Sequence, residues 1–585
     1  MMETKTLVLK ENLLLGFMVG ALLGGLAGVF EVVPFLKENE YLTTGFLNIA
    51  LDNSVRLLNH QLLVFITIAV DVSLLLTILK IRNNLILAVI TPLYLFFGYQ
   101  LNKTSWYPDF LTLQAIAGNL FITATWIILL LKYRLKEHRD IRMLKKIFVA
   151  FVGLAVILNL ALFMNQRALQ GQIKDRPNVI LISIDALRAD HVGAYGYKEN
   201  TTPNLDELAR KGTIFHNHIA DASWTLPAHT AILTSQYPHV IGVEDIYQSI
   251  PKSTLTLPEI LKNYGYNTKG IISFAFVEPM YGFDQGFDEY DIFNSYFRGE
   301  YRDKWYKSSP DITDKAISWI IKNKDKRFFL FLHYFDVHEA YNPPSPFDKR
   351  FNVSENEVVN AYDGEIAYTD YHLGRLFSQL SALNLTGNTL IIVTADHGDA
   401  FMEHGVYGHE PTVYEEVIQT PLIISLLGKI PEDKVVVKQT QSIDVAPTVL
   451  DVLGFPIHKE FSGETLLPLI FEEGKGGRYC TFSRVVSQWY HKETVRTSKY
   501  KLIHVYEPLN VTLDNTTRVH SYELYNLEQD PGEKINLIAE RPDAALELRT
   551  VLDDWVSRGK NANVTGQPIE LSEAAKKRLE SMGYL

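Results

Sequence analysis

The sequence predicts two parts: an all-α membrane domain of five transmembrane helices, followed by an α/β domain with a mostly parallel central sheet. Two observations lead to this fold class. Long apolar runs dominate the first 170 residues, and the remaining residues alternate short, β-branched apolar runs with helical patterns. Strands that alternate with helices favour a parallel sheet covered on both faces. The 585 residues are enough for one large domain and a second part.

Five segments before residue 170 are apolar and long enough to cross a bilayer. They are residues 13–30, 62–79, 85–101, 110–131 and 147–166. Because four apolar segments follow the first one, a cleaved signal peptide is excluded. With the N-terminus in the cytoplasm, most Lys and Arg residues fall on the inside, including seven between residues 132 and 146. We therefore expect an integral, multi-pass membrane protein with a cytoplasmic N-terminus, an extracytoplasmic catalytic domain and the lipid bilayer as a partner.

Charge and cysteine content exclude several kinds of partner and site. The net charge of −11 gives no sign of nucleic-acid binding, so we expect no nucleic-acid partner. Cys480 is the one cysteine, so neither a disulfide nor a cysteine-based zinc site can form within the chain. A lone cysteine is most often a packing residue, and we assign Cys480 no other role.

Strands buried on both faces read as continuous apolar, β-branched runs, and five such runs follow residue 170. They are residues 178–186, 268–274, 328–335, 389–395 and 421–427, and helical patterns lie between them at 203–211, 257–264, 312–322 and 361–383. In parallel sheets, ligands bind beyond the carboxyl ends of the strands. Polar residues at or after these ends are therefore candidate functional residues: Asp185, His338, Asp396 and His397.

Three motifs carry chemistry: SIDALRADH at 183–191, WTLPAHTAILT at 224–234 and TADHGD at 394–399. Two carboxylates and an imidazole, Asp185, Asp396 and His397, make a plausible site for a divalent metal. Thr225 precedes Pro227, which suits the first turn of a helix, so its hydroxyl is expected at the positive helix end. A hydroxyl placed there beside a metal is an activated nucleophile. Taken singly, each piece also fits a structural role as a strand or helix cap.

In their order and context, these motifs resemble the sulfatases of the alkaline-phosphatase superfamily, over roughly residues 176–585. The likeness includes RPNVILISIDALRADHVGAYGY, SWTLPAHTAILTSQYP, FFLFLHYFDVHEAYNPP, VTADHGDAFMEHGVYGH and the late YELYNLEQDPGEKINL. It implies an alkaline-phosphatase-like sandwich with a small C-terminal sheet subdomain. The expected divisions are a membrane domain at 1–170, a catalytic domain at 171–480, and a small-sheet subdomain and tail at 481–585.

The resemblance also implies a role for each matching residue. Asp185, Asp396 and His397 stand at metal-ligand positions, and Thr225 stands at the position of the nucleophile, which also contacts the metal. Residues outside the metal group that are implied to act on the substrate are His338 and His409, which contact sulfuryl or phosphoryl oxygens in the family. His229 replaces the family's arginine and is one candidate to protonate the leaving group. Five further polar residues are expected to be structural: Arg188, Asp190, His191, Glu403 and His404.

The chain departs from the family at the nucleophile and at the metal. Formylglycine sulfatases need Cys or Ser in a C/S-x-P-x-R signature, whereas this chain has Thr225-Leu-Pro227-Ala-His229. Threonine cannot give formylglycine by that route. Many sulfatases carry Asp-Asn, which suits calcium, where this chain has Asp396-His397. An imidazole favours manganese or zinc, with calcium or magnesium as alternatives.

These departures favour the threonine-nucleophile phosphotransferases and phosphodiesterases of the same superfamily. We therefore predict a metal-dependent hydrolase or phosphotransferase that acts on phosphate esters or diesters through Thr225. The predicted substrate is a membrane-surface or cell-envelope molecule, such as a lipid head group or a surface glycan. Two alternatives remain: a sulfuric ester hydrolase that works without formylglycine, and a catalytically weak binding or sensing membrane protein that keeps the fold.

Overall fold

The computed structural model describes residues 173–293, 307–352, 354–409, 412–472, 475–486, 491–507, 519–562, 566–573 and 576. The chain divides into two compact units, residues 1–172 and 173–585, and the described residues all belong to the second. The five predicted membrane helices therefore lie outside the described residues. The predicted domain boundaries at 170 and 480 stay predictions.

The predicted location needs correction. None of the helices in the described ranges combines the length and the apolar character that a bilayer-spanning helix needs. The two longest of them, α11 (Glu357–Ala382) and α15 (Pro542–Asn561), carry several charged side chains and bury only part of their residues. For the part of the chain that the structure describes, the prediction of an integral membrane protein with an extracytoplasmic catalytic domain is wrong, whereas the bilayer partner, which rested on segments outside the described residues, stays a prediction.

A central sheet organises the described chain. Its strands follow the order β11-β2-β10-β7-β1-β6-β4-β5. Neighbouring strands are parallel, except that β10 runs antiparallel to both β2 and β7. The predicted mostly parallel sheet is confirmed. The strands are β1 (Asn178–Ile184), β2 (Thr213–Ile219), β4 (Asn267–Ile272), β5 (Glu289–Ile292), β6 (Phe328–Tyr334), β7 (Thr389–Thr394), β10 (Leu422–Ser425) and β11 (Lys434–Gln441).

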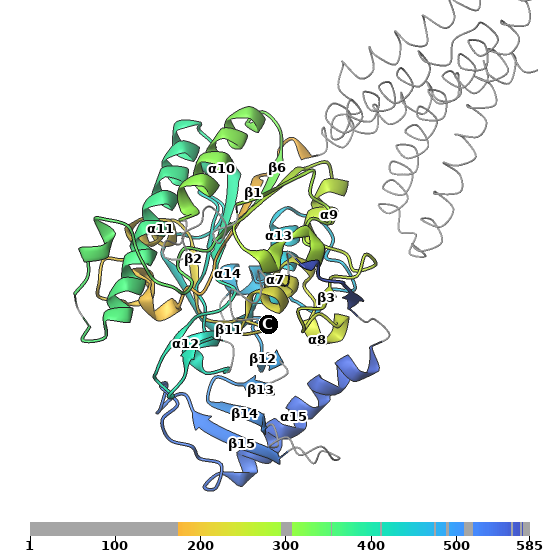
Figure 1. Ribbon diagram of the computed structural model, residues 1–585. Helices are drawn as coiled ribbons and strands as arrows, with labels where there is room; N and C mark the ends of the chain where they lie inside the picture. Colours follow the sequence, from red (N-terminus) through yellow and green to blue (C-terminus); the bar gives the residue numbers. More distant parts are fainter. Residues whose placement is uncertain are drawn as a thin grey trace, which may run out of the picture. The chain divides into compact units, whose positions relative to one another are not determined.

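Helices cover both faces of this sheet (Figure 1). On one face lie α6 (Pro203–Arg210), α10 (Ser309–Asn323) and α11. On the other lie α7 (Thr225–Thr234), α9 (Leu257–Asn263) and α13 (Val445–Val452). All four helical patterns predicted from the sequence are helices here.

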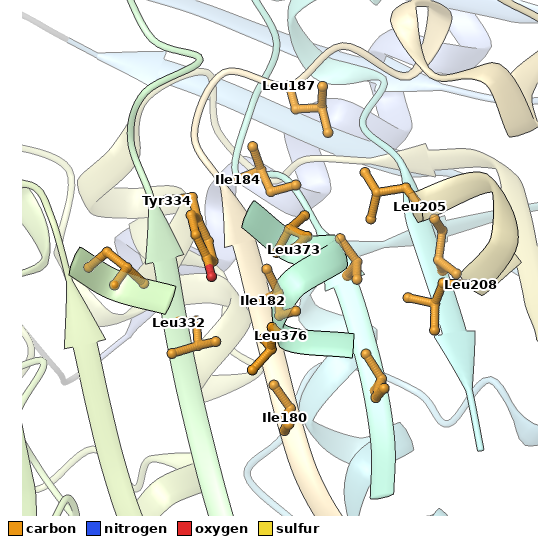
Figure 2. Close-up of a cluster of buried hydrophobic side chains, with 14 of the residues drawn as sticks. Ile180, Ile182, Ile184, Leu187, Leu205, Leu208, Leu332, Tyr334, Leu373 and Leu376 are labelled. Carbon is orange, nitrogen blue, oxygen red and sulfur yellow. The ribbon is translucent and has the colours of Figure 1, made fainter. Parts of the chain in front are cut away.

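Side chains of β1 alternate between two faces: one face packs in the apolar cluster, and the other carries the candidate functional residues. Figure 2 shows Ile180, Ile182 and Ile184 packed with Leu332 of β6 and Leu376 of α11 in one buried cluster. Because successive side chains of a strand point to opposite faces, the residues between these isoleucines and just after them face the α7 side. That parity directs the first candidate metal ligand away from the apolar cluster.

A second, smaller sheet follows near the C-terminus. Its four antiparallel strands are β12 (Thr481–Val486), β13 (His491–Arg496), β14 (Tyr500–Glu507) and β15 (Val519–Asn526). Helix α15 packs on it through Leu548, Leu552 and Trp555. The small sheet that the sequence led us to expect is therefore present.

Buried ion pairs join the small sheet to the central one. Glu415 opens the short helix α12 (Glu415–Ile418) and pairs with Arg496 at 2.9 Å and with Lys501 at 3.0 Å. Lys501, which is fully buried, also lies 2.9 Å from the Glu533 carboxylate. Since a buried charge is costly unless paired, these contacts hold the small sheet against α12, and Arg496 also donates to Asn217 of β2 at 3.1 Å, which joins the two sheets.

Truncating the apolar cluster tests its weight in stability. Replacing the fully buried Ile182 by Ala should lower the free energy of unfolding by about 2–5 kcal/mol, because a cavity remains. Urea denaturation of both proteins measures the difference. Val437→Ala, at a side chain 66% exposed on β11, is the control and should change little. Equal effects of the two substitutions would contradict the described packing.

Removing one charge from the inter-sheet network should be costly. Lys501→Met leaves the Glu415 and Glu533 carboxylates short of a partner, and we expect a loss of about 3–5 kcal/mol in the free energy of unfolding. Denaturant titration beside Lys499→Met, at an exposed lysine of the same region, provides the comparison. A loss no larger than that of the control would show that the network is not buried in solution.

Candidate active site

Two carboxylates meet at the end of two neighbouring parallel strands. Asp185 follows β1 directly, and Asp396 comes two residues after β7. The register pairs Ser183 with Thr394, so the two strand ends are level. Asp185, Asp396 and the adjacent His397 are fully buried. The structure therefore brings together the three residues that the sequence singled out as a metal-binding group.

Each carboxylate is held by one oxygen and leaves the other without a partner. Asp185 Oδ2 lies 3.1 Å from His333 Nε2 and 3.5 Å from Thr225 Oγ1. Asp396 Oδ1 accepts backbone N–H bonds from Ala186 at 3.3 Å and from His397 at 3.0 Å. Asp185 Oδ1 and Asp396 Oδ2, in contrast, are buried and have no hydrogen-bond partner among the described residues.

The unpartnered oxygens converge on an unpartnered nitrogen. His397 Nε2 lies 3.5 Å from Asp185 Oδ1 and 3.4 Å from Asp396 Oδ2, and it too is buried without a hydrogen bond. His397 Nδ1 donates to the Gly398 carbonyl at 2.8 Å, which leaves Nε2 with its lone pair. Buried polar atoms are normally satisfied, so this group of two oxygens and one nitrogen fits a divalent cation.

A second group, His229, His333 and Asp396, overlaps the first and also has ligand atoms close together. It is less suited to a metal, because both nitrogens of His229 are engaged. His229 Nδ1 lies 2.9 Å from the Thr225 carbonyl oxygen, and Nε2 lies 2.9 Å from Ser183 Oγ. The same two contacts favour a structural role for His229 over the expected proton donation.

Burial and mutual repulsion set the charges of this group. Burial, followed by repulsion from Asp396, raises the pKa of Asp185 well above its usual range. Burial also acts to raise the pKa of Asp396, but three neighbouring histidines, His397 foremost, outweigh it and lower that pKa. Burial brings the pKa of His229 to about 3 and that of His333 to about 4, so both rings are neutral near pH 7.

Thr225 is the first residue of α7, as its position before Pro227 led us to expect. Its hydroxyl lies 3.5 Å from Asp185 Oδ2, at the helix end where the macrodipole favours negative charge. Thr225 and the rest of α7 are fully buried. The predicted nucleophile thus stands at the edge of the proposed ligand group.

His338 and His409 lie beside the ligand group. The ring centroid of His409 is 4.2 Å from that of His397, in a stacked arrangement, and 5.0 Å from that of His338. His338 Nδ1 donates to the Glu339 carbonyl at 2.9 Å, and its buried Nε2 has no partner within the described ranges. Both rings therefore sit where they can contact a group bound at the cation.

The remaining polar residues of the motifs hold the loop after β7. Arg188 donates to the Asp399 carbonyl oxygen at 3.0 Å and pairs with Asp190 and Glu403. His404 Nδ1 lies 2.7 Å from the Glu416 carboxylate. His191 Nδ1 likewise lies 2.7 Å from the Asp363 carboxylate. All five residues expected to be structural have structural contacts.

Comparison with known proteins identifies the family to which the chain belongs. A model of the family described as Sulfatase matches residues 177–455. The chain belongs to the sulfatase family. A second model, described as the C-terminal region of N-sulphoglucosamine sulphohydrolase, matches residues 402–556. The protein is accordingly an ester hydrolase of the alkaline-phosphatase superfamily. Enzymes of this superfamily use a divalent metal ion, which agrees with the buried ligand group.

Individual relatives agree with this sulfatase-family membership. A Delta 4,5-hexuronate-2-O-sulfatase of Bacteroides thetaiotaomicron is 25% identical over 463 residues, spanning 67% of this chain and 91% of that protein. A structure solved in complex with its substrate D-glucosamine-2-N,6-O-disulfate has a TM-score of 0.55 at 22% identity and covers 66% of this chain and 99% of its own. The structure of the phosphonate monoester hydrolase of Agrobacterium radiobacter has a TM-score of 0.55 at 19% identity. It covers 68% of this chain and 99% of its own. These structural likenesses show the fold.

Sequence reasoning assigned no role to four residues of this sulfatase-family site: Ser183 and Asp399, which lie in the three motifs that carry chemistry, and His333 and Tyr341, which do not. His333 and Ser183 are side chains within apolar strands, where patterns of hydrophobicity hide single polar residues. Asp399 accepts a hydrogen bond from the Tyr341 hydroxyl and lies 3.7 Å from His409 Nδ1. A signal existed for His333, because it is the lone imidazole inside the run FFLFLHYF, where only apolar residues are needed for packing.

Divalent metal should stabilise the fold through this group. We expect Mn²⁺ at about a hundred times its dissociation constant to add about 2.7 kcal/mol to the free energy of unfolding. Thermal melts with and without Mn²⁺, after chelation, measure the shift. Asp396→Asn should abolish it. Asp363→Asn, at a buried aspartate bonded to His191, is the control and should keep it. A shift that survives Asp396→Asn would place the ion elsewhere.

Proposed function

We propose that this sulfatase-family chain cleaves singly charged phosphorus esters, phosphate diesters above all, with Thr225 as the nucleophile. The observation that carries the proposal is the place of the Thr225 hydroxyl. It stands at the start of α7 and 3.5 Å from Asp185, beside unpartnered ligand atoms of Asp185, Asp396 and His397. Threonine gives no formylglycine, so the hydroxyl itself must attack.

The charge around Thr225 favours a substrate with one negative charge. Among the described residues, no Lys or Arg makes a hydrogen bond or ion pair with Thr225, His338 or the proposed ligands. The nearby Arg188 is occupied by Asp190 and Glu403. A divalent ion balances the two carboxylates and leaves little excess positive charge. A phosphate monoester, which carries two negative charges near pH 7, is therefore a poorer match than a diester.

Each residue of the site has its own chemical role in the proposed reaction. Asp185, Asp396 and His397 would hold a divalent ion, which would supply Lewis-acid polarisation of the ester and favour loss of the Thr225 hydroxyl proton. Thr225 Oγ1 attacks phosphorus and forms a phosphothreonine ester, the bond between phosphorus and one ester oxygen breaks, and the proton lost by the Thr225 hydroxyl ends on that oxygen, which leaves as an alcohol. His338 presents a lone pair at Nε2, so it can take a proton from the water that releases the second product. His409 lies against His338 and His397 and confines the transferring group.

The ligand chemistry also bears on the choice of metal. We infer that manganese or zinc is preferred, because His397 contributes a nitrogen, whereas calcium and magnesium take oxygen ligands. The proposal is supported by the lone pair at His397 Nε2, which faces both unpartnered carboxylate oxygens.

A second candidate is sulfate-ester hydrolysis by the unmodified threonine. It is favoured by the match to the sulfatase family model and by relatives named as sulfatases. A sulfate monoester also carries a single negative charge, so the site suits it on the same electrostatic grounds. A sulfated glycan would be the substrate class, as the names of the relatives suggest. The weak-binding alternative would require that Thr225→Ala leave biological function intact.

A substrate panel with Thr225 variants tests the proposal. Full-length protein is assayed on an aryl phosphodiester, an aryl sulfate and an aryl phosphate, with Mn²⁺ or Zn²⁺. We expect diester turnover to be the fastest and Thr225→Ala to lower its kcat/KM more than about a thousandfold, since the nucleophile is lost. Thr230→Ala is the control, because the Thr230 hydroxyl lies on the same helix but donates to the Leu226 carbonyl oxygen of that helix. Thr225-dependent sulfate release with esters of phosphate untouched would instead establish the second candidate.

A further inference from the structure

His333 contacts the proposed metal site from within the sheet. It lies in β6 at the position whose register partner is Ser183 of β1. Because side chains two apart on a strand share a face, Ser183, Asp185 and His333 all point toward α7. The His333 ring is fully buried, and its centroid lies 4.9 Å from that of His229. Packing alone does not require an imidazole in this apolar strand.

One hydrogen bond gives His333 a specific partner. Its Nε2 lies 3.1 Å from Asp185 Oδ2, and its Nδ1 has no partner among the residues that the structure describes. The neutral ring therefore carries its hydrogen on Nε2 and donates a hydrogen bond to the Asp185 carboxylate. Within the described ranges, no backbone N–H bonds the Asp185 carboxylate, and the N–H of Ala186 donates to Asp396 instead.

The two carboxylates are thus held in matching ways. Backbone N–H groups fix Asp396 Oδ1, and the His333 imidazole fixes Asp185 Oδ2. In each case the second oxygen alone remains to face His397 Nε2. A carboxylate fixed in this way can bind an ion through one oxygen only, whereas a free carboxylate can bind through both.

We propose that His333 is a positioning residue that holds Asp185 in one-oxygen coordination and thereby favours a small, nitrogen-accepting ion over calcium. The inference rests on the metal group assigned above. Calcium takes more ligands and often binds both oxygens of a carboxylate, so it gains when Asp185 can turn. Partners that orient a metal ligand typically contribute 10–100-fold to metal affinity.

Calorimetric titration of chelator-treated, full-length protein with Mn²⁺ and with Ca²⁺ tests this without any activity assay. His333→Leu removes the donor, His333→Phe removes it but keeps a ring, and His333→Gln keeps an N–H near the position of Nε2. The control is His218→Leu, at a fully buried histidine of β2 whose ring meets Thr440 and Ser442. Thermal melts show which variants fold, and the comparison holds with either Leu or Phe.

We expect the Leu and Phe variants to raise the dissociation constant for Mn²⁺ by about 10–100-fold and to raise that for Ca²⁺ less, so that selectivity shifts toward calcium. The Gln variant and the His218 control should stay close to the wild type. Unchanged Mn²⁺ binding in the Leu or Phe variant, or a Gln variant as weak as they are, would overturn the role of His333. A wild type that binds neither ion would overturn the metal group as well, which separates the two failures.

Discussion

Two buried carboxylates that lie close together constrain the rest of this site. Asp185 and Asp396 come from neighbouring strand ends, both are fully buried, and repulsion between them contributes to the raised pKa of Asp185. Burying two like charges is costly unless donors and a cation compensate. Backbone N–H groups, the His333 imidazole and the start of α7 supply the donors. Burial keeps the His229 and His333 rings neutral near pH 7, so these two rings do not supply the missing positive charge, which a bound divalent ion would supply.

Strands that are completely buried could be predicted from the sequence, whereas strands that are only partly buried could not. Strands β1, β6, β7 and β10 lie inside the sheet and show continuous apolar runs, and the inner strand β4 ends in one. Strand β11 lies at the edge and alternates buried with exposed residues, and β2 beside it carries polar side chains, so neither forms such a run. Edge strands are specified by pairing as much as by hydrophobicity, and pairing is not visible in a local window.

The same division applies to the site. Asp185, Asp396 and His397 follow apolar runs, and the rule that ligands bind at the carboxyl ends of strands was enough to gather them. Thr225 was placed by the helix-start signal of Pro227. His333 and Ser183 required more, because their meaning depends on the register that sets β6 beside β1. The roles assigned to these residues stay predictions, whereas membership in the sulfatase family is confirmed.

The position of β1 has a consequence for how the protein is made. This strand stands between β6 and β7, and its end meets His333, which lies 148 residues beyond Asp185, and Asp396, which lies 210 residues beyond Ala186. A ribosome must therefore release about half of the unit at residues 173–585 before β1 has both neighbours. Such non-local pairing raises the contact order and slows folding. Until then the nascent chain displays an apolar strand with two open edges, which makes synthesis the stage at which aggregation competes most with folding.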